Sequence, residues 1–181
     1  MLIVCSCRYH YPGVTNNIVI GLDTYIELAA HPNIVGCKMS HGNVSHHVQV
    51  ALDPAIDHEN FRVYSGFGQQ LGPIVLFGAA GVIDGLAAIY PRTVARLFDV
   101  AAKRPVTPEA LKEIQELQFV VSRAEEMIAK WGIVGIKEGV YRVLQIGNLQ
   151  GGRLPLKGSL PNGEWESWSV PMDAMRKLEQ A

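Results

Sequence analysis

One lysine stands at the end of a short apolar run in the stretch HPNIVGCKMSHGN, residues 31–43. Residues 33–38, taken as a strand, alternate between two faces that are apolar except at Lys38. A strand that is apolar on both faces is typical of a parallel sheet covered by helices, and such folds place their chemistry at the carboxyl ends of the strands. Partial shielding from water there favours the neutral amine, which attacks carbonyl carbons. Lys38 therefore stands where such folds place their chemistry and is a candidate nucleophile.

Two other groups of residues suggest chemistry less well. The histidines His41, His46 and His47 suggest a metal site, but neighbouring helical residues point about 100° apart and no acidic or cysteine side chain completes a set. We expect a solvated helix start there and no metal. The segment AAGVIDG, residues 79–85, has glycines but lacks the following lysine and the spacing of nucleotide-binding loops. No cofactor is therefore expected.

The composition is that of an ordinary globular chain with one sizeable core. The chain has 181 residues, of which 48% are hydrophobic and 18% charged, and its net charge is −1. No basic surplus suggests nucleic acid, and no apolar run reaches the roughly 20 residues that span a membrane or forms a secretory signal. We expect a cytoplasmic protein. Its three cysteines, an odd number, are expected to be reduced core residues rather than disulfides.

Strands and helices are expected to alternate over the first hundred residues. The apolar patterns predict strands at 1–9, 33–38, 61–66 and 80–85, and helices at 16–31, 44–52, 69–77 and 91–102. Four βα units imply parallel strands with right-handed crossovers. They make half of an eight-stranded barrel, which typically needs about 250 residues.

After Lys103 the pattern predicts helices only. Thr107 is a suitable N-cap for a long helix that reaches Trp131, and a second helix is expected at 136–144. Residues 147–171 are rich in Gly, Pro and Ser and are expected to form a loop before a last helix at 172–179. We therefore expect a partial TIM barrel at 1–104 and a C-terminal helical extension at 105–181.

Several motifs resemble the pyruvate-dependent class I aldolases, the family of dihydrodipicolinate synthase and N-acetylneuraminate lyase. The segment YHYPGVT, residues 9–15, is similar to the family's Y-N-x-P-x-x-T after the fifth barrel strand. HPNIVGCKMSHGN is similar to the sixth strand, VYSGFG (63–68) to the seventh, and FGAAGVIDGLAAIYP (77–91) to the eighth. GGRLPL (151–156) resembles a motif of the C-terminal extension. The resemblance covers roughly residues 2–156 and implies the C-terminal half of a TIM (β/α)8 barrel, in an N-terminally truncated chain.

This resemblance implies specific roles for five residues. Lys38 stands at the position of the family's Schiff-base lysine, and Tyr9 at that of the tyrosine that acts as acid and base. In the family, the positions of Ser65, Gly66 and Ile83 lie at the carboxyl end of the barrel strands, beside the lysine, and bind the substrate. The implied partner is a small-molecule 2-keto acid. Taken alone, a strand-end lysine is more often a solvated cap and a tyrosine more often a core aromatic, so these roles depend on the motifs.

The sequence leaves several alternatives for the substrate of this chain and for its activity. Dihydrodipicolinate synthases carry an arginine at the position of Val14, so synthase-type condensation is disfavoured. The motif at residues 9–15 is more similar to that of family members that cleave 4-hydroxy-2-oxoglutarate or 2-keto-3-deoxy sugar acids to pyruvate and an aldehyde. The sequence contains no Gly-Thr-Thr-Gly-Glu segment, whose threonines hold the keto acid in the family. A second hypothesis is therefore an inactive half-barrel that forms a homo-oligomer or associates with a full-length relative, and a third is a truncated gene product.

Overall fold

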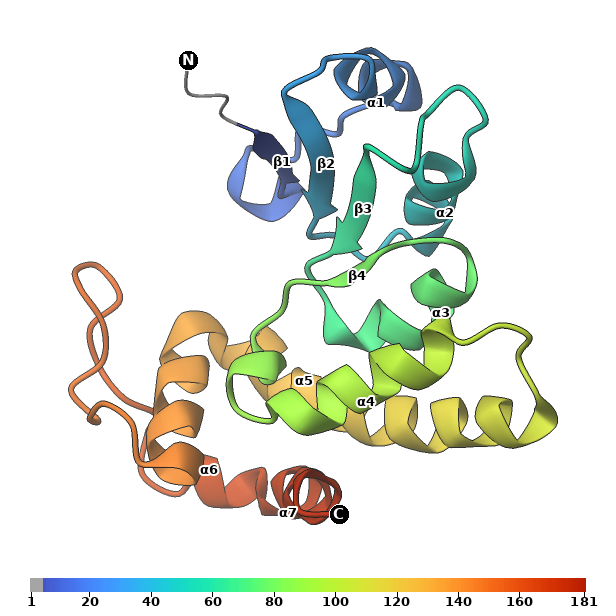
Figure 1. The fold of residues 1–181 in the computed structure, drawn as a ribbon. Coiled ribbons are helices and arrows are strands. Elements are labelled where there is room, and N and C mark those ends of the chain that lie inside the picture. The colour runs from blue at the N-terminus through green and yellow to red at the C-terminus, as the bar shows by residue number, and fades with distance from the viewer. Residues whose placement is uncertain (1–4) are drawn as a thin grey trace. The chain divides into compact units, whose positions relative to one another are not determined.

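The chain forms two compact units, which divide between Ile83 and Asp84. The structure is a computed structural model and describes residues 5–181 (Figure 1). The first unit contains a parallel sheet with its helices, and the second contains helices and loops. The division falls before the helix at 91–102, which the sequence analysis grouped with the partial barrel.

The sheet has four parallel strands in the order β1-β2-β3-β4. They span Ser6–His10 (β1), Ile34–Met39 (β2), Arg62–Ser65 (β3) and Gly81–Val82 (β4). The prediction of four parallel βα units is confirmed, although β4 is much shorter than the predicted 80–85. The first residues of the predicted strand 1–9 lie outside the described residues.

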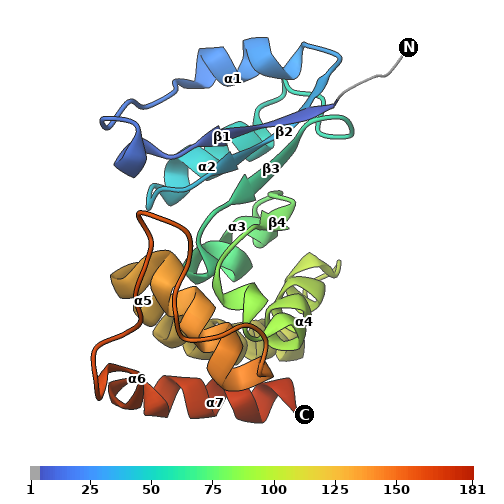
Figure 2. The same ribbon diagram turned by 90° about the vertical axis from the view of Figure 1, so that its left-hand side faces the viewer.

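Helices cover one face of this sheet. The first unit contains the 3-10 helices η1 (Pro12–Val14) and η2 (Gly68–Gln70) and the helices α1 (Leu22–Ala29), α2 (Val44–Leu52) and α3 (Leu71–Leu76). Each of α1, α2 and α3 packs on the strand next to it, and neighbouring helices contact one another (Figure 2). Asn43 caps α2, because its side chain accepts a hydrogen bond from the backbone N–H of His46 at 3.0 Å. The apolar face of each helix is thereby buried against the sheet.

The second unit is built around one long helix. It contains η3 (Leu86–Ala88), α4 (Pro91–Ala102), α5 (Pro108–Leu144), α6 (Glu164–Ser167) and α7 (Ser169–Glu179). α5 is interrupted at Gly132, where φ is 53° and ψ is −136°, a conformation that favours glycine. The prediction of two successive helices is therefore confirmed, with the break at this glycine. The prediction that residues 164–171 form a loop is wrong, since they fold into α6 and the start of α7.

Helices α4, α5 and α7 pack together. The buried apolar residues of this core include Leu97, Val100, Ile114, Leu117, Val121, Met172 and Met175. Glu179 of α7 caps the start of α4, because its carboxylate accepts hydrogen bonds from the backbone N–H groups of Arg92 and Thr93 at 2.9 and 2.8 Å. The last helix is thus fixed by both apolar contact and charge.

No described helix combines the length and the apolar character that a membrane span requires.

The cysteines differ from the prediction. Cys5 and Cys7 are exposed and only Cys37 is buried, so the expectation of three core thiols is wrong for two of them. Cys5 directly precedes the edge strand β1, and Cys7 lies in that strand on the same face as Tyr9. Burial raises the pKa of the Cys37 thiol to about 12. That thiol is therefore protonated at neutral pH and is not a nucleophile.

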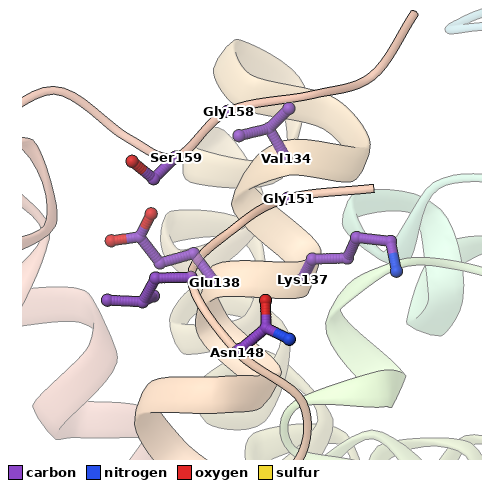
Figure 3. A pocket seen from close by; sticks show the side chains of 8 residues that line it. Val134, Lys137, Glu138, Asn148, Gly151, Gly158 and Ser159 are labelled. Atoms are coloured by element: carbon purple, nitrogen blue, oxygen red, sulfur yellow. The ribbon is translucent and has the colours of Figure 1, made fainter. Parts of the chain in front are cut away.

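A shallow pocket lies between the second half of α5 and the loop at 148–159 (Figure 3). Lys137 and Glu138 of α5 line it together with Asn148. The Glu138 carboxylate is already engaged, since it accepts hydrogen bonds from the Arg142 side chain at 2.8 Å and from the backbone N–H of Leu160 at 2.7 Å. The buried carboxylate therefore fastens the loop to the helix.

A second carboxylate joins α6 to α5. One oxygen of Glu164 accepts hydrogen bonds from Lys130 Nζ at 2.6 Å, Trp131 Nε1 at 2.7 Å and Trp168 Nε1 at 2.9 Å. These donors, the Lys130 ammonium first, lower the pKa of Glu164 from 4.5 to about 2. The ionised form is favoured more strongly in the folded chain than in the unfolded chain.

The folded chain should therefore lose stability as Glu164 is protonated. Its ionisation stabilises the fold above pH 4.5, and this contribution disappears as the pH falls from there toward 2. We expect Glu164→Gln to lower the free energy of unfolding in urea at pH 7 and to lower it less at pH 3. Glu166→Gln is the control, because that side chain is 65% exposed. If Glu164→Gln lowers the free energy of unfolding by the same amount at pH 7 and at pH 3, the lowered pKa of Glu164 is contradicted.

Candidate active site

The pairing of β1 with β2 brings an amine and a phenol together. Tyr9 lies beside Lys38 in the parallel register, and Lys38 lies beside Tyr64 of β3. The Lys38 Nζ is 4.3 Å from the centroid of the Tyr9 ring. Lys38 is half-buried and Tyr9 is 55% exposed, on the face opposite the helices. An ammonium over an aromatic face is attractive, so the ring holds the lysine close to the carboxyl end of the strand.

Ser40 is a third polar residue of this site. Its Oγ donates a hydrogen bond to the Tyr9 hydroxyl at 3.1 Å, while the Tyr9 ring stacks on Tyr11 with centroids 5.7 Å apart. Ser40 was not predicted as a site residue from the sequence. Its position two residues after Lys38 was the available signal, because residues i and i+2 of an extended segment share a face.

Ser65 lies on the opposite face of the sheet from the lysine. Its register partner is Met39 rather than Lys38, and its side chain is fully buried. The hydroxyl donates to Gln70 Oε1 at 2.6 Å and accepts from the backbone N–H of Phe67 at 3.0 Å. The side chain therefore stabilises the turn after β3 and does not point toward Lys38.

Gly66 and Ile83 follow the ends of β3 and β4. The Gly66 N–H donates to the Met39 carbonyl at 2.9 Å, and a Cβ on this glycine would lie 1.8 Å from the Ser40 Oγ. The Ile83 N–H donates to the Ser65 carbonyl at 2.9 Å, and its side chain is 48% exposed. Gly66 thus gives Ser40 the room it needs beside Tyr9, while Ile83 presents an apolar side chain at the same end of the sheet.

The histidines around α2 contradict the expectation of a solvated helix start. His46 is 8% exposed and His47 is fully buried. The His47 ring lies with Nδ1 2.8 Å from the Asn43 carbonyl oxygen and Nε2 3.0 Å from the Met39 carbonyl oxygen. It therefore connects the end of β2 to the start of α2. Burial depends here on how the helix packs on the strands, which the local sequence does not reveal.

Burial also changes the acidity of three other rings. Desolvation lowers the pKa of His41 to about 4, with further lowering from the neighbouring histidines. The pKa values of His10 and His46 are also lowered, mainly by burial. These imidazoles are therefore neutral at pH 7.

Comparison with known proteins gives one family and related enzymes. Residues 7–143 match the Dihydrodipicolinate synthetase family. A protein of Emericella nidulans named "Probable 4-hydroxy-2-oxoglutarate aldolase, mitochondrial" is 28% identical over 132 residues, which are 73% of this chain and 40% of that protein. The L-threo-3-deoxy-hexylosonate aldolase of Hypocrea jecorina is 29% identical over 154 residues, 82% of this chain and 47% of that protein. The chain thus spans less than half the length of these two relatives.

A solved structure shows the same fold. The dihydrodipicolinate synthase of Aquifex aeolicus superposes with a TM-score of 0.77 at 22% identity, over 97% of this chain and 56% of that chain. At this identity the likeness shows the fold alone. The prediction of the C-terminal half of a TIM barrel followed by a helical extension is confirmed.

The close approach of Gly66 to Ser40 gives a test of the site's packing. We expect Gly66→Ala to lower the free energy of unfolding by about 1–3 kcal/mol, because the added methyl group overlaps the Ser40 side chain and lies 3.1 Å from its Cα. Urea denaturation measures this change. Gly42→Ala is the matched control, since nothing lies within 4 Å of a Cβ at that position. Equal stabilities of the two variants would show that Ser40 does not occupy this place.

Proposed function

Since the chain belongs to the dihydrodipicolinate synthetase family, we propose that it is a carbon–carbon lyase that forms a Schiff base on Lys38. The observation that carries the proposal is the 4.3 Å approach of the Lys38 amine to the Tyr9 ring at the carboxyl ends of β1 and β2. A nucleophilic amine and an acid/base phenol on one face are the two groups that this chemistry requires.

The reaction proceeds through a covalent imine. The neutral Lys38 amine adds to the keto carbon of the substrate, and loss of water gives an iminium ion. Tyr9 gives its proton to the departing water, and the resulting phenolate then accepts the proton of the substrate's 4-hydroxyl group. The carbon–carbon bond breaks, and its electron pair moves into the iminium to give an enamine and an aldehyde. Protonation of the enamine and hydrolysis of the imine release pyruvate and restore the amine.

Ser40 and Gly66 position the phenol. The hydrogen bond from Ser40 Oγ to the Tyr9 oxygen fixes the hydroxyl and stabilises negative charge on it when the proton leaves. Gly66 leaves room for that serine. Ile83 gives the substrate an apolar neighbour, whereas the buried Ser65 acts on the site through its backbone and through Gln70.

The substrate we propose is a 2-keto acid with a hydroxyl group at C4, either 4-hydroxy-2-oxoglutarate or a 2-keto-3-deoxy sugar acid. The names of the two fungal relatives support this class. Val14 stands where family synthases carry an arginine, and a valine does not bind the carboxylate of a second substrate. This disfavours the synthase-type condensation, which is the alternative within the family.

A second candidate function is that of an inactive partner of another polypeptide. Several large apolar side chains of the first unit are exposed, which favours association with a second copy or with a longer relative. They are Tyr9, Val14, Ile18, Val19, Val35, Leu52, Phe77 and Ile83. The sequence also has no Gly-Thr-Thr-Gly-Glu segment to hold a keto-acid carboxylate.

Imine trapping separates these functions. We expect incubation with pyruvate and borohydride to add one reduced pyruvate to the chain, at Lys38, as measured by intact mass and peptide mapping. Lys38→Ala should remove the adduct, while Lys103→Ala, a change at the end of α4, should keep it. Folded wild-type protein without an adduct would favour the inactive partner.

The Tyr9 hydroxyl has a separate test. We expect Tyr9→Phe to retain the pyruvate adduct but to lower the rate of aldol cleavage by about 10²–10⁴-fold, because the amine remains while the acid/base group is lost. The rate is measured as pyruvate released from 4-hydroxy-2-oxoglutarate or from a 2-keto-3-deoxy sugar acid. Tyr11→Phe is the control, since no hydrogen bond to the Tyr11 hydroxyl is present within residues 5–181. Unchanged cleavage by Tyr9→Phe would remove the tyrosine from the mechanism.

A further inference from the structure

Three histidines meet on the helix-covered side of the sheet, at the ends of β1 and β2. His10 ends β1, His41 follows β2, and His46 lies in the first turn of α2. One ring nitrogen from each lies within 4.8 Å of those of the other two. The ring centroids are 5.1 Å apart for His10 and His41, 5.2 Å for His41 and His46, and 6.1 Å for His10 and His46. Segments that are far apart in the sequence thus bring three imidazoles to one point.

Two of these rings have nitrogens that lack protein partners. Within residues 5–181, the buried Nε2 of His41 has no hydrogen-bond partner. The ring of His46 likewise makes no hydrogen bond in the described part of the chain, although 92% of its surface is covered. The unpartnered buried nitrogen of His41 costs free energy, which a ligand at this point would recover.

The third ring is oriented by its neighbours. The Tyr25 hydroxyl lies 2.8 Å from His10 Nδ1 and fixes that nitrogen. Among the described residues, His10 Nε2 makes two long contacts, each of 3.3 Å, with the Ile18 carbonyl and the Ile20 N–H. A histidine that binds a metal through one nitrogen commonly gives the other to an oxygen acceptor, and Tyr25 supplies that oxygen.

The surrounding backbone holds the set in place. Gln70 Nε2 donates to the His41 carbonyl at 3.1 Å, and Asn43 caps the helix that carries His46. His47 is not a fourth ligand, because both its ring nitrogens lie against carbonyl oxygens. The three-histidine cluster of His10, His41 and His46 is therefore a distinct group with an anchored backbone.

We propose that the three-histidine cluster binds one zinc ion, with the fourth coordination position open to water. Three neutral imidazoles, joined by no carboxylate or thiolate from the part of the chain that the structure describes, suit Zn²⁺ and similar transition metals rather than Mg²⁺ or Ca²⁺. Zn–N bonds of about 2.0–2.1 Å place tetrahedral ligands about 3.3 Å apart, so the rings move together by about 1.5 Å at most. His41, in the loop before α2, makes this adjustment and gives up its 3.3 Å contact with the Asn43 N–H.

This site is independent of the proposed Schiff base. His10 is in register with Met39, one residue beyond the pair of Tyr9 and Lys38, so its side chain leaves the strand on the opposite face. The ion would join β1, the loop after β2 and the start of α2. It would stabilise the folded chain as any ligand does that binds only the folded state.

The test is zinc binding to the full chain after removal of metal with a chelator. Cys5 and Cys7 are exposed thiols that also bind zinc, so the protein carries Cys5→Ser and Cys7→Ser. We expect calorimetry to show one Zn²⁺ per chain and the thermal midpoint to rise with zinc. His41→Ala should weaken binding at least about tenfold. His31→Ala is the control, because His31 is an exposed histidine of another loop.

Cobalt gives a readout of the ligands themselves. Co²⁺ in place of zinc should give the visible absorption of a four-coordinate nitrogen site, lost in His41→Ala and kept in His31→Ala. His46→Gln provides a second variant if far-UV circular dichroism shows that His41→Ala is unfolded. Stoichiometric binding that survives both cluster variants, or no binding by the folded parent protein, would overturn the proposal.

Discussion

The parallel register between β1 and β2 is the constraint on which both proposed sites depend. It places Tyr9 beside Lys38 on one face and His10 beside Met39 on the other. Because side chains alternate along a strand, a slip by one residue would replace Lys38 with Cys37 or Met39 on the open face and would move His10 away from Tyr25. The pairing of two backbones therefore fixes both the amine with its phenol and the three-histidine cluster.

The residues around these sites act mainly by holding the loops that follow the strands. The Ser65 hydroxyl binds Gln70, and Gln70 in turn binds the carbonyl of His41. Gly66 packs against Ser40, which binds the Tyr9 hydroxyl. Ser65 and Gly66, to which the family motifs assign substrate binding, thus also connect the ends of neighbouring strands. One short motif can therefore serve both structure and chemistry.

The sequence predicts what local patterns control and misses what packing controls. Apolar periodicity predicted α2 and α4 with the bounds that the structure has. The family motifs singled out Lys38 and Tyr9, and the structure has the Lys38 Nζ 4.3 Å from the Tyr9 ring centroid. The burial of His46 and His47 was missed, because it arises only when α2 packs on the sheet. Residues 164–171 were predicted to form a loop because the segment around them is rich in Gly, Pro and Ser. In the structure a helix begins at Glu164, and its side chain accepts hydrogen bonds from Lys130 and Trp131 of α5, which are distant in the sequence.

The imidazole of His47 has a dynamic consequence. It lies between the carbonyl oxygens of Met39 and Asn43, so the buried ring contacts both ends of the loop that carries Ser40 and His41 and donates a hydrogen bond to one of them. The loop as a whole can therefore move away only if the His47 ring also leaves its buried place. The phenol and the amine are then presented on a rigid edge, with no loop rearrangement needed to bring them together before a substrate arrives.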